Sequence, residues 1–228
     1  NKVLRMNLRD RDILQSTPLL AGLNPPLVKR ILDGVVISSS EAKDVLFREG
    51  NTADCFYVVL SGYIRLYRIG ADGKEADTGV FGPGDVFGQC AMFLGDRHTF
   101  NAQAAEPVTL ARFDYAKVRQ IMREEPEFTF ALMSIMAHHL DDARSNVAND
   151  RLRTAPQRVA NYLLELSDAN GNGAPASFRL PFQKSLLAGK LGLAPEALSR
   201  AFSLLKNSGV SIRGRVIHIS DAEALRKI

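Results

Sequence analysis

Three polar residues near the C-terminus have the side chains and the spacing needed to form hydrogen bonds with the edges of DNA bases. Glu196, Ser199 and Arg200 lie within about one turn of a predicted helix. Arginine can donate two hydrogen bonds to the O6 and N7 atoms of guanine, glutamate can accept one from an amino group of cytosine or adenine, and serine can lie near a thymine. The apolar residues of the same segment fall on the opposite side: Leu198, Phe202 and Leu205. The pattern predicts a helix that reads bases in a major groove.

A second short helix and a hairpin flank this helix. Residues 183–207 contain two helical segments, of which the first stops at Gly192 and the second starts at Ala194-Pro195. Such a pair forms a helix-turn-helix. Two short runs at 210–212 and 216–219 predict a hairpin, the wing of a winged helix. Four residues of this segment are suited to phosphate contacts: Lys184, Ser185, Arg213 and Arg215. A purely structural helical hairpin is the alternative.

Charge is distributed unevenly along the chain. The net charge is +4, from 29 basic and 25 acidic residues. Residues 151–228 contain 12 Lys and Arg against 5 Asp and Glu, whereas the remaining residues contain 17 against 20. A basic C-terminal part on a mildly acidic body indicates that one part of the protein meets a polyanion. A basic surface that contacts only solvent is the alternative.

The residues that precede this segment predict a separate β-rich domain. Between 37 and 114, short apolar runs alternate with glycines, at 45–47, 56–60, 63–68, 78–81 and 108–113. Ala71-Asp72-Gly73 has the composition of a hairpin turn. Many short strands at even spacing are typical of a sandwich or barrel, and we expect a double-sheet roll. The apolar spacing in 8–36 predicts helices before the roll, interrupted by prolines.

A long helix is predicted between the two parts, from about 126 to 150. Its apolar residues step by three and four positions, as in a coiled-coil seam: Met133, Met136, Leu140, Ala143 and Val147. Met and Ala form an adaptable seam rather than a strongly specific one. We expect two copies of the chain to pair through this helix as a homodimer, and a helix that lies on its own β-domain is the alternative. The expected domains are 1–125, 126–150 and 151–228.

Length and composition exclude several classes of protein. Of the 228 residues, 46% are hydrophobic and 24% are charged, as in globular proteins with a buried core. No apolar run approaches the roughly 18 residues that would span a bilayer, and the polar N-terminus does not resemble a signal peptide. Only Cys55 and Cys90 are present, which argues for a reducing compartment. We expect a cytoplasmic protein with no membrane partner.

Taken together, these features resemble the catabolite activator/fumarate-nitrate regulator (Crp/Fnr) family. The resemblance rests on Glu-x-x-Ser-Arg at 196–200, on the winged helix and on glycine motifs at 50–62 and 84–88, in the family's domain order from about 12 to 222. It implies an α+β protein with an N-terminal β-roll of the cyclic-nucleotide-binding type, a double-stranded β-helix or jelly roll. A dimerisation helix and a C-terminal winged helix-turn-helix domain would follow.

The resemblance also implies a function and its partners. It implies a homodimeric transcription factor that binds double-stranded DNA, RNA polymerase and a small-molecule effector. The expected DNA half-site is TTGAT-like, repeated as an inverted pair one helical turn apart. Within this site, Glu196, Ser199 and Arg200 would contact bases, and the basic residues named above would contact phosphates.

An effector pocket in the roll is a further implication of the resemblance. The matching residues are Gly88, Gln89, Cys90, Arg97, His98, Thr99 and Arg144. In members that bind cyclic AMP, a glutamate accepts from the ribose and an arginine neutralises the phosphate. Gln89 and His98 stand in those places here, and Ala143 and Arg144 replace hydroxyl residues that contact adenine. These differences argue against cyclic AMP, unless Arg97 reaches the phosphate in a shifted register.

The resemblance also bears on two other kinds of effector site, an iron–sulfur cluster and a haem. An iron–sulfur cluster needs four cysteines, and this chain has two. The closest resemblance is to the dissimilatory nitrate respiration regulators, which are thought to sense nitric oxide through haem. The candidate haem ligands here are His98, His138 and His139. Cys90 is either a redox target or a small buried hydrophobe, and the effector stays open.

Two other classes of function are the alternatives. We expect no enzyme, because the sequence contains no nucleophile elbow, Walker loop or His-Glu-x-x-His motif. A β-roll enzyme with a small-molecule pocket and an adaptor that does not bind DNA are the competing hypotheses. Loss of salt-dependent DNA binding would favour either of them, and substrate turnover would favour the enzyme.

Overall fold

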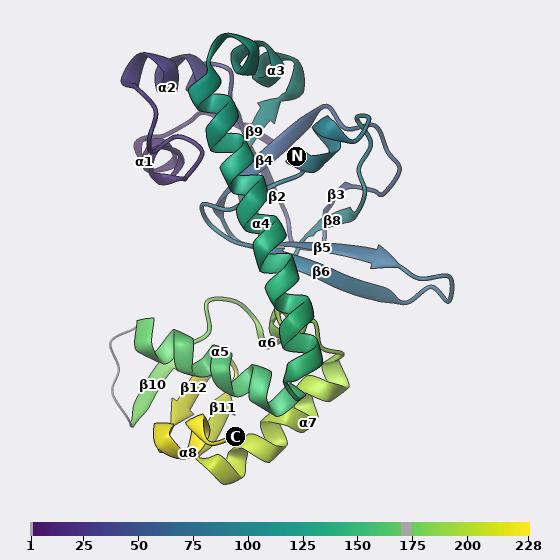
Figure 1. Cartoon of the computed structure of the whole chain (residues 1–228), viewed down its shortest axis with the longest axis vertical. Helices are drawn as coiled ribbons and strands as arrows, with labels where there is room; N and C mark the ends of the chain where they lie inside the picture. The colour runs from purple at the N-terminus through teal and green to yellow at the C-terminus, as the bar shows by residue number, and fades with distance from the viewer. Residues whose placement is uncertain (1, 170–174) are drawn as a thin grey trace. The chain divides into compact units, whose positions relative to one another are not determined.

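The structure is a computed structural model and describes residues 2–169 and 175–228. The chain divides into two compact units, Asn1–Asp142 and Ala143–Ile228, and one long helix is shared between them (Figure 1). Each unit is described by itself. Within the described residues, no helix is long and apolar enough to cross a membrane.

Two capped helices follow the first strand of the first unit. Helix α1 spans Leu8–Ser16 and helix α2 spans Pro25–Leu32. Asn7 and Asp10 form a capping box at the start of α1, with donor–acceptor distances of 2.9 and 3.0 Å. Asn24 caps α2, whose first residue is a proline, a position at which the missing N–H costs nothing. The helices predicted in 8–36 are confirmed.

Two antiparallel sheets form the β-roll of the first unit. The five-stranded sheet has the order β1-β2-β9-β4-β7, and the four-stranded sheet has the order β3-β8-β5-β6. The strands span Lys2–Leu4 (β1), Val36–Ser40 (β2), Val45–Phe47 (β3), Cys55–Ser61 (β4), Ile64–Ile69 (β5), Glu75–Phe81 (β6), Val86–Phe87 (β7), Asn101–Ala104 (β8) and Val108–Asp114 (β9). The five predicted runs correspond to β3, β4, β5, β6 and β9, so the predicted roll is confirmed.

Four strands were not predicted, because they are short or rich in polar residues. Strand β2 reads Val-Ile-Ser-Ser-Ser, and consecutive serines have little intrinsic preference for a strand. It nevertheless forms a strand because β1 pairs with one of its edges and β9 with the other. Pairing with neighbours therefore decided the conformation of this segment.

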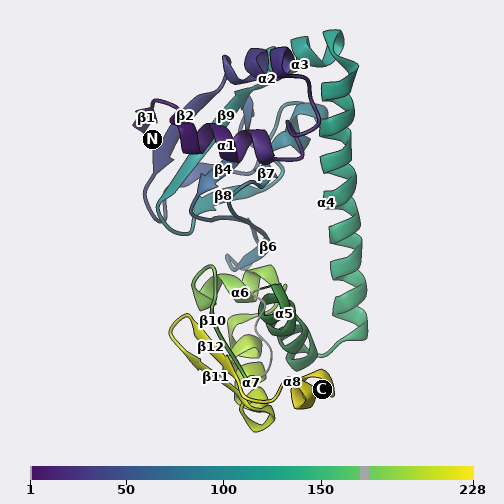
Figure 2. The ribbon, with the colours of Figure 1, turned by 90° about the vertical axis from the view of Figure 1, so that its left-hand side faces the viewer.

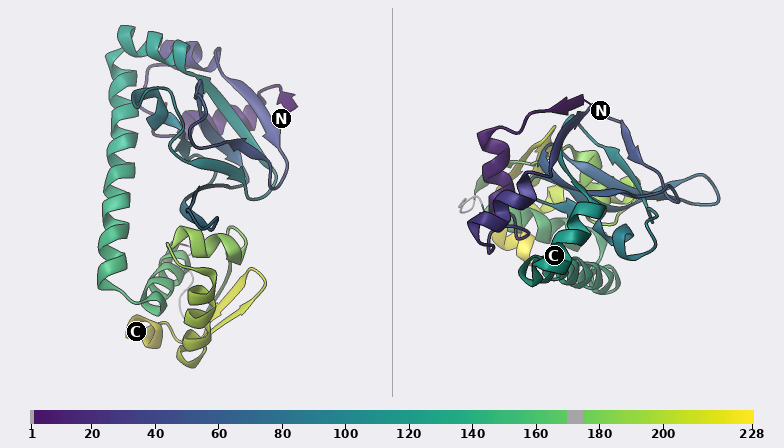
Figure 3. Two further views of the ribbon diagram at one scale, coloured as in Figure 1. Left: turned by 90° about the vertical axis from the view of Figure 1, so that its right-hand side faces the viewer. Right: turned by 90° about the horizontal axis from the view of Figure 1, so that it is seen from above.

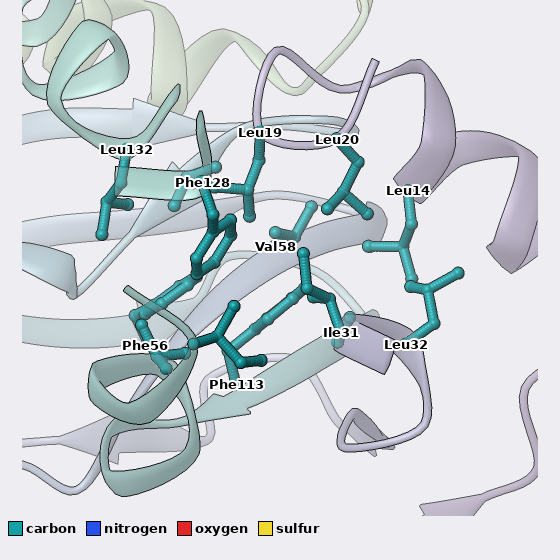
Figure 4. Packing of buried hydrophobic residues seen from close by; sticks show 14 of the residues in the cluster. Leu14, Leu19, Leu20, Ile31, Leu32, Phe56, Val58, Phe113, Phe128 and Leu132 are labelled. Carbon is teal, nitrogen blue, oxygen red and sulfur yellow. The ribbon is translucent and has the colours of Figure 1, made fainter. Parts of the chain in front are cut away.

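Strand β4 of the five-stranded sheet is buried on both of its faces, which explains its continuous apolar run. Phe56 and Val58 belong to the cluster that packs against the helices, where the rings of Phe56 and Phe113 stack with centroids 4.8 Å apart (Figure 4). Val59 belongs to a second cluster, together with Phe87. Helix α1 contacts β4 on the first of these faces (Figure 2). Strand β4 is thus packed between two apolar clusters.

Two helices follow the roll, α3 (Tyr115–Glu124) and α4 (Pro126–Leu152). The first half of α4 packs on the roll through Phe128, Leu132 and Ile135, each at most 6% exposed. In Figure 4, Phe128 and Leu132 join the cluster that contains the first two helices. Their spacing of four and three residues was not recognised in the sequence. The alternative that this helix lies on its own β-domain is therefore true of its first half.

After the end of α4, the described part of the second unit consists of a three-stranded sheet and five helical segments, with the strand order β10-β12-β11 (Figure 3). The elements span Ala155–Ala169 (α5), Ala176–Arg179 (β10), Lys184–Lys190 (α6), Pro195–Leu205 (α7), Lys206–Ser208 (η2), Val210–Arg213 (β11), Val216–Ile219 (β12) and Ala222–Arg226 (α8). The core contains Leu163, Leu187, Phe202, Ile217 and Leu225. The predicted winged helix-turn-helix is confirmed.

Candidate functional site

The exposed face of α7 carries the three residues that were predicted to read bases. Glu196, Ser199 and Arg200 are all exposed, whereas Leu198 and Phe202 on the opposite face are buried. Among the described residues, no hydrogen bond or ion pair engages the Glu196 carboxylate or the Arg200 guanidinium. Polar groups without a protein partner are free to bond to a ligand. The fold brings the three side chains to one face, and base reading stays a prediction.

The turn between α6 and α7 sets the direction of α7. Helix α6 ends in a Schellman motif, in which the Leu193 N–H donates to the Ala188 carbonyl at 2.8 Å and the Gly192 N–H donates to the Gly189 carbonyl at 3.2 Å. Gly192 has a φ of +60°, which favours glycine. This is the stop that the sequence predicted at Gly192, and it lets the chain turn at once into the second helix.

Three of the four predicted phosphate contacts lie at accessible positions. Ser185 and Arg213 are exposed. Lys184 is the first residue of α6, and its ammonium lies 4.8 Å from the centroid of the Phe202 ring. This cation–π contact holds the charge beside α7. The structure thus places the charge of Lys184 beside α7, and phosphate binding by Lys184, Ser185 and Arg213 stays a prediction.

The fourth predicted phosphate contact, Arg215, has a different environment from the one expected. Its Nε donates to the Leu180 carbonyl at 3.1 Å, and its terminal nitrogen donates to the Pro181 carbonyl. The guanidinium therefore joins the wing to the segment before α6. Two of its three guanidinium nitrogens are therefore directed to the backbone, and phosphate contact by Arg215 stays a prediction.

A cavity of about 100 Å³ lies in the first unit, where the effector pocket was expected. It is lined by strands of the roll, by the short helix η1 (Gln89–Phe93) and by α4, and it is open on one side. The walls include five of the seven predicted residues: Gly88, Gln89, Cys90, His98 and Thr99. The other walls are largely apolar: Phe47, Leu66, Phe81, Val86, Phe87, Ala91, Phe100 and His139.

The two predicted arginines do not line this cavity. Arg97 is exposed and donates to the Gly50 carbonyl at 2.9 Å. It precedes His98, and adjacent residues of an extended segment point to opposite sides, so His98 faces inward and Arg97 outward. Arg144 is exposed and belongs to the second unit. The idea that Arg97 neutralises a phosphate in a shifted register therefore has no support from this geometry.

Gln89, in the wall of the cavity, forms a hydrogen bond with a residue of the long helix α4. Its side chain is 1% exposed, and its Nε2 lies 3.0 Å from Nδ1 of His139 on α4. Because the amide nitrogen can only donate, Nδ1 accepts and the imidazole carries its proton on Nε2. Burial lowers the pKa of His139 and favours this neutral form. The Gln89 Oε1 has no hydrogen-bond partner among the described residues.

His98 is held by packing rather than by a polar partner. Its ring stacks on Phe47 with centroids 3.6 Å apart and planes 5° apart. Burial lowers its pKa, against a smaller opposing effect of Asp54. His98 is thus a neutral aromatic wall of the cavity.

Two of the three candidate haem ligands, His98 and His139, line the cavity, and haem binding stays a prediction. His138 is exposed and does not line it, and Nδ1 of His139 is occupied by Gln89. Within the described part of the chain, no three His, Cys, Asp or Glu residues form a group that could hold a metal ion.

Neither cysteine has the environment of an activated thiol. Both are unpaired, Cys55 in the core and Cys90 on η1. Burial raises the pKa of the Cys55 thiol to about 11, and it also raises the pKa of the Cys90 thiol although that residue is exposed overall. A raised pKa leaves little reactive thiolate.

The predicted seam of α4 is largely exposed in the single chain. Met133, Leu140 and Val147 are 60%, 54% and 51% exposed, and Met136 is half-buried. Ala143 is also exposed. Phe130, which was not predicted, is the most exposed of these apolar side chains at 73%. Its position three residues before Met133 extends the same stripe and could have been read from the spacing.

Comparison with known proteins identifies both parts of the chain. Residues 38–125 match the cyclic nucleotide-binding domain, and residues 157–228 match the Crp-like helix-turn-helix domain. The chain is 32% identical over 168 residues to the nitrogen fixation regulation protein FixK of Bradyrhizobium diazoefficiens, covering 73% of this chain and 70% of the relative. It is 28% identical to the transcriptional activator protein Anr of Pseudomonas protegens, covering 96% and 84%.

A solved structure extends the similarity over nearly the whole length. DNR from Pseudomonas aeruginosa is 29% identical to this chain, with a TM-score of 0.53, and the match covers 98% of this chain and 99% of that one. The order of domains is the same as in the relatives, which are transcriptional regulators rather than enzymes. Proteins of this kind bind DNA through the helix-turn-helix domain and act as dimers. With the roll, the long helix and the winged helix in this order, the chain belongs to the Crp/Fnr family of transcriptional regulators.

Proposed function

We propose that two copies of this chain bind an inverted repeat of TTGAT-like half-sites, with one α7 helix in each half-site. The observation that supports this proposal most directly is the exposed face of α7, where Glu196, Ser199 and Arg200 have polar groups available to DNA. In this arrangement Arg200 binds the guanine, Glu196 accepts from an amino group of cytosine or adenine, and Ser199 lies near the thymine. Lys184, Ser185 and Arg213 contact phosphates.

The test is DNA binding by the full-length protein, measured by fluorescence anisotropy on the inverted repeat and on random DNA over a range of salt concentrations. Arg200→Ala should cost about 1–3 kcal/mol on the repeat and relax the choice of base at the guanine. Arg213→Ala should weaken binding to both DNAs alike and lower the salt slope by about one unit. Arg226→Ala is the matched control, because Arg226 lies on α8, paired with Glu223.

Two results would contradict the assignment of the base-reading residues. One is an in vitro selection that recovers half-sites without the TTGA core. The other is an equal loss for Arg200→Ala on random and selected DNA, which would make this arginine a phosphate contact. Failure of the protein to bind any DNA in a salt-dependent manner would favour an adaptor that does not bind DNA.

We further infer the setting in which the protein works. The β-roll senses a small effector and adjusts the recognition helices, without catalysing a reaction. The protein acts in the cytoplasm together with RNA polymerase, where the DNA that it regulates is found. Transcription in vitro with purified RNA polymerase, with and without the protein, tests this partnership and gives the sign of regulation.

A further inference from the structure

We propose that the outer face of the three-stranded sheet binds DNA phosphates outside the half-site, with Arg179 as a cation that spacing along the sequence did not single out. The inference rests on the proposed function and deepens it, because it extends the contact beyond the base pairs that α7 would read. It depends on the pairing register of the three strands, on the charge of the face and on its position beside the wing.

The outer face of the sheet consists of exposed side chains. In β10, β11 and β12 exposed residues alternate with buried or half-buried ones, so every second residue points away from the core. Helices α5 and α7 pack on the other side of the sheet (Figure 2). The outward residues are Ser177, Arg179, Ser211, Arg213, Val216 and His218.

The strand register places two arginines in one row across the sheet. Arg179 of β10 and Arg213 of β11 are both paired with Val216 of the central strand β12. Neighbouring strands are about 4.8 Å apart, so the two arginines are about 10 Å apart at the backbone, with the small apolar side chain between them. Arg179 and Arg213 are far apart in sequence, and the sheet brings them to one face.

The two arginines give the face a positive charge that the described residues do not neutralise. None of the outward residues is acidic. Among the described residues, no hydrogen bond or ion pair engages the guanidinium of Arg179 or of Arg213. In the next row, His218 is paired with Ser177 and Ser211, whose hydroxyl groups can also donate. Two free cations among hydrogen-bond donors are suited to a polyanion.

The position of the row identifies this polyanion as DNA. Arg213 is the last residue of β11 before the turn of the wing. Leu180, the residue after Arg179, donates its N–H to the Arg215 carbonyl at 2.7 Å. The row therefore lies at the end of the sheet that leads into α6, whose first residue, Lys184, we expect to contact a phosphate. The charged face continues the surface that the proposed function assigns to the DNA backbone.

The sheet separates this face from the recognition helix. Strand β11 contacts α7 from the buried side, where Val210 is part of the core. With α7 in the groove of the half-site, the outer face would be directed at the backbone that continues past it. Phosphate contacts supply affinity without reading the sequence, so flanking DNA of any sequence would be bound.

The experiment compares two duplexes that carry the same inverted repeat, one ending at the repeat and one extended on each side by about ten base pairs, one helical turn. Binding of the full-length protein is measured by fluorescence anisotropy over a range of salt concentrations. We expect the extended duplex to bind about tenfold more tightly at low salt. Its salt dependence should be steeper, because each additional phosphate that is neutralised releases counterions.

Variants test whether Arg179 is responsible for this preference. Arg179→Ala should reduce the preference for the extended duplex and leave binding to the short duplex unchanged. Arg179→Lys should keep the preference, because a point charge is sufficient to bind a phosphate. Arg226→Ala is the matched control, since Arg226 is an exposed arginine of the same unit that is paired with Glu223. It should leave both affinities unchanged.

Ethylation interference on the extended duplex locates the contact. It should reveal a phosphate outside the half-site whose modification weakens binding of the unmodified protein but not of Arg179→Ala. A loss caused by altered folding would not remove the effect of one particular phosphate.

Four results would overturn the inference. They are equal binding to the two duplexes, an unchanged preference in Arg179→Ala, and interference confined to the half-sites. The fourth is a loss of transcription with RNA polymerase in Arg179→Ala while every DNA measurement stays the same, which would assign the face to an acidic protein surface. Binding to the repeat without any gain from extension would refute this inference alone, whereas no salt-dependent binding to either duplex would refute the proposed function as well.

Discussion

Replacing Arg215 with alanine separates two roles that a wing-tip arginine can have. In the structure its guanidinium donates to the carbonyls of Leu180 and Pro181 and joins the wing to the segment before α6. Hydrogen bonds from charged groups contribute about 1.5–3 kcal/mol each. Because both freed carbonyls can bind water in the variant, we expect a loss of about 1–2 kcal/mol in the free energy of unfolding of the second unit.

Thermal unfolding followed by circular dichroism measures this loss. For a unit of this size, each kcal/mol lowers the melting temperature by about 4–8 °C. Arg215→Lys keeps the charge but not the fork of donors, so it should restore DNA affinity if the residue contacts phosphate and should not restore stability if it anchors the wing. Arg213→Ala is the control at the exposed side of the tip. An unchanged melting temperature for Arg215→Ala, with a salt slope reduced by about one unit, would refute the anchoring role.

Three further predictions concern the first unit and the long helix. Replacing both Met136 and Leu140 with glutamate places like charges in the seam and should give monomers in sedimentation; a species that stays dimeric would place the interface elsewhere. Burial lowers the pKa of His98 and His139 below the value of about 6.5 expected in the unfolded chain, so the free energy of unfolding should fall as the pH drops below about 6.5, with a shallower slope for His139→Gln in denaturant titrations. Phe56→Ala removes a ring that is 0% exposed and should lower the free energy of unfolding by about 3–5 kcal/mol in the same assay; a loss under 1 kcal/mol would mean that the core relaxes around the gap.

Helix α4 has two apolar faces with different uses. Phe128 and Leu132 are buried against the roll, whereas Phe130 and Met133 are exposed. A helix that is apolar on several sides has no clear one-sided pattern. The residue spacing therefore predicted the dimer seam but not the face that packs on the roll. His139, which lines the cavity, lies on the same helix. A ligand in the cavity would therefore contact the element that we expect to pair two copies of the chain.

The sequence by itself determined the features that depend on local spacing. The short apolar runs between glycines, the stop at Gly192 and the outward face of Glu196 and Arg200 are all properties of short segments. Each follows from side-chain direction within one helix or strand, whatever the remainder of the chain does. The order of roll, long helix and winged helix, and with it the family, could be predicted for this reason.

Only the tertiary structure decided which polar groups meet. Gln89 and His139 are 50 residues apart in sequence and 3.0 Å apart in space, and Arg215 finds its acceptors 34 and 35 residues earlier. Arg97 and His98 are neighbours in sequence and lie on opposite sides of the wall. Such contacts depend on how whole elements pack and on which donors remain after the backbone is paired. Spacing along one segment carries no information about the atoms that another segment brings to it.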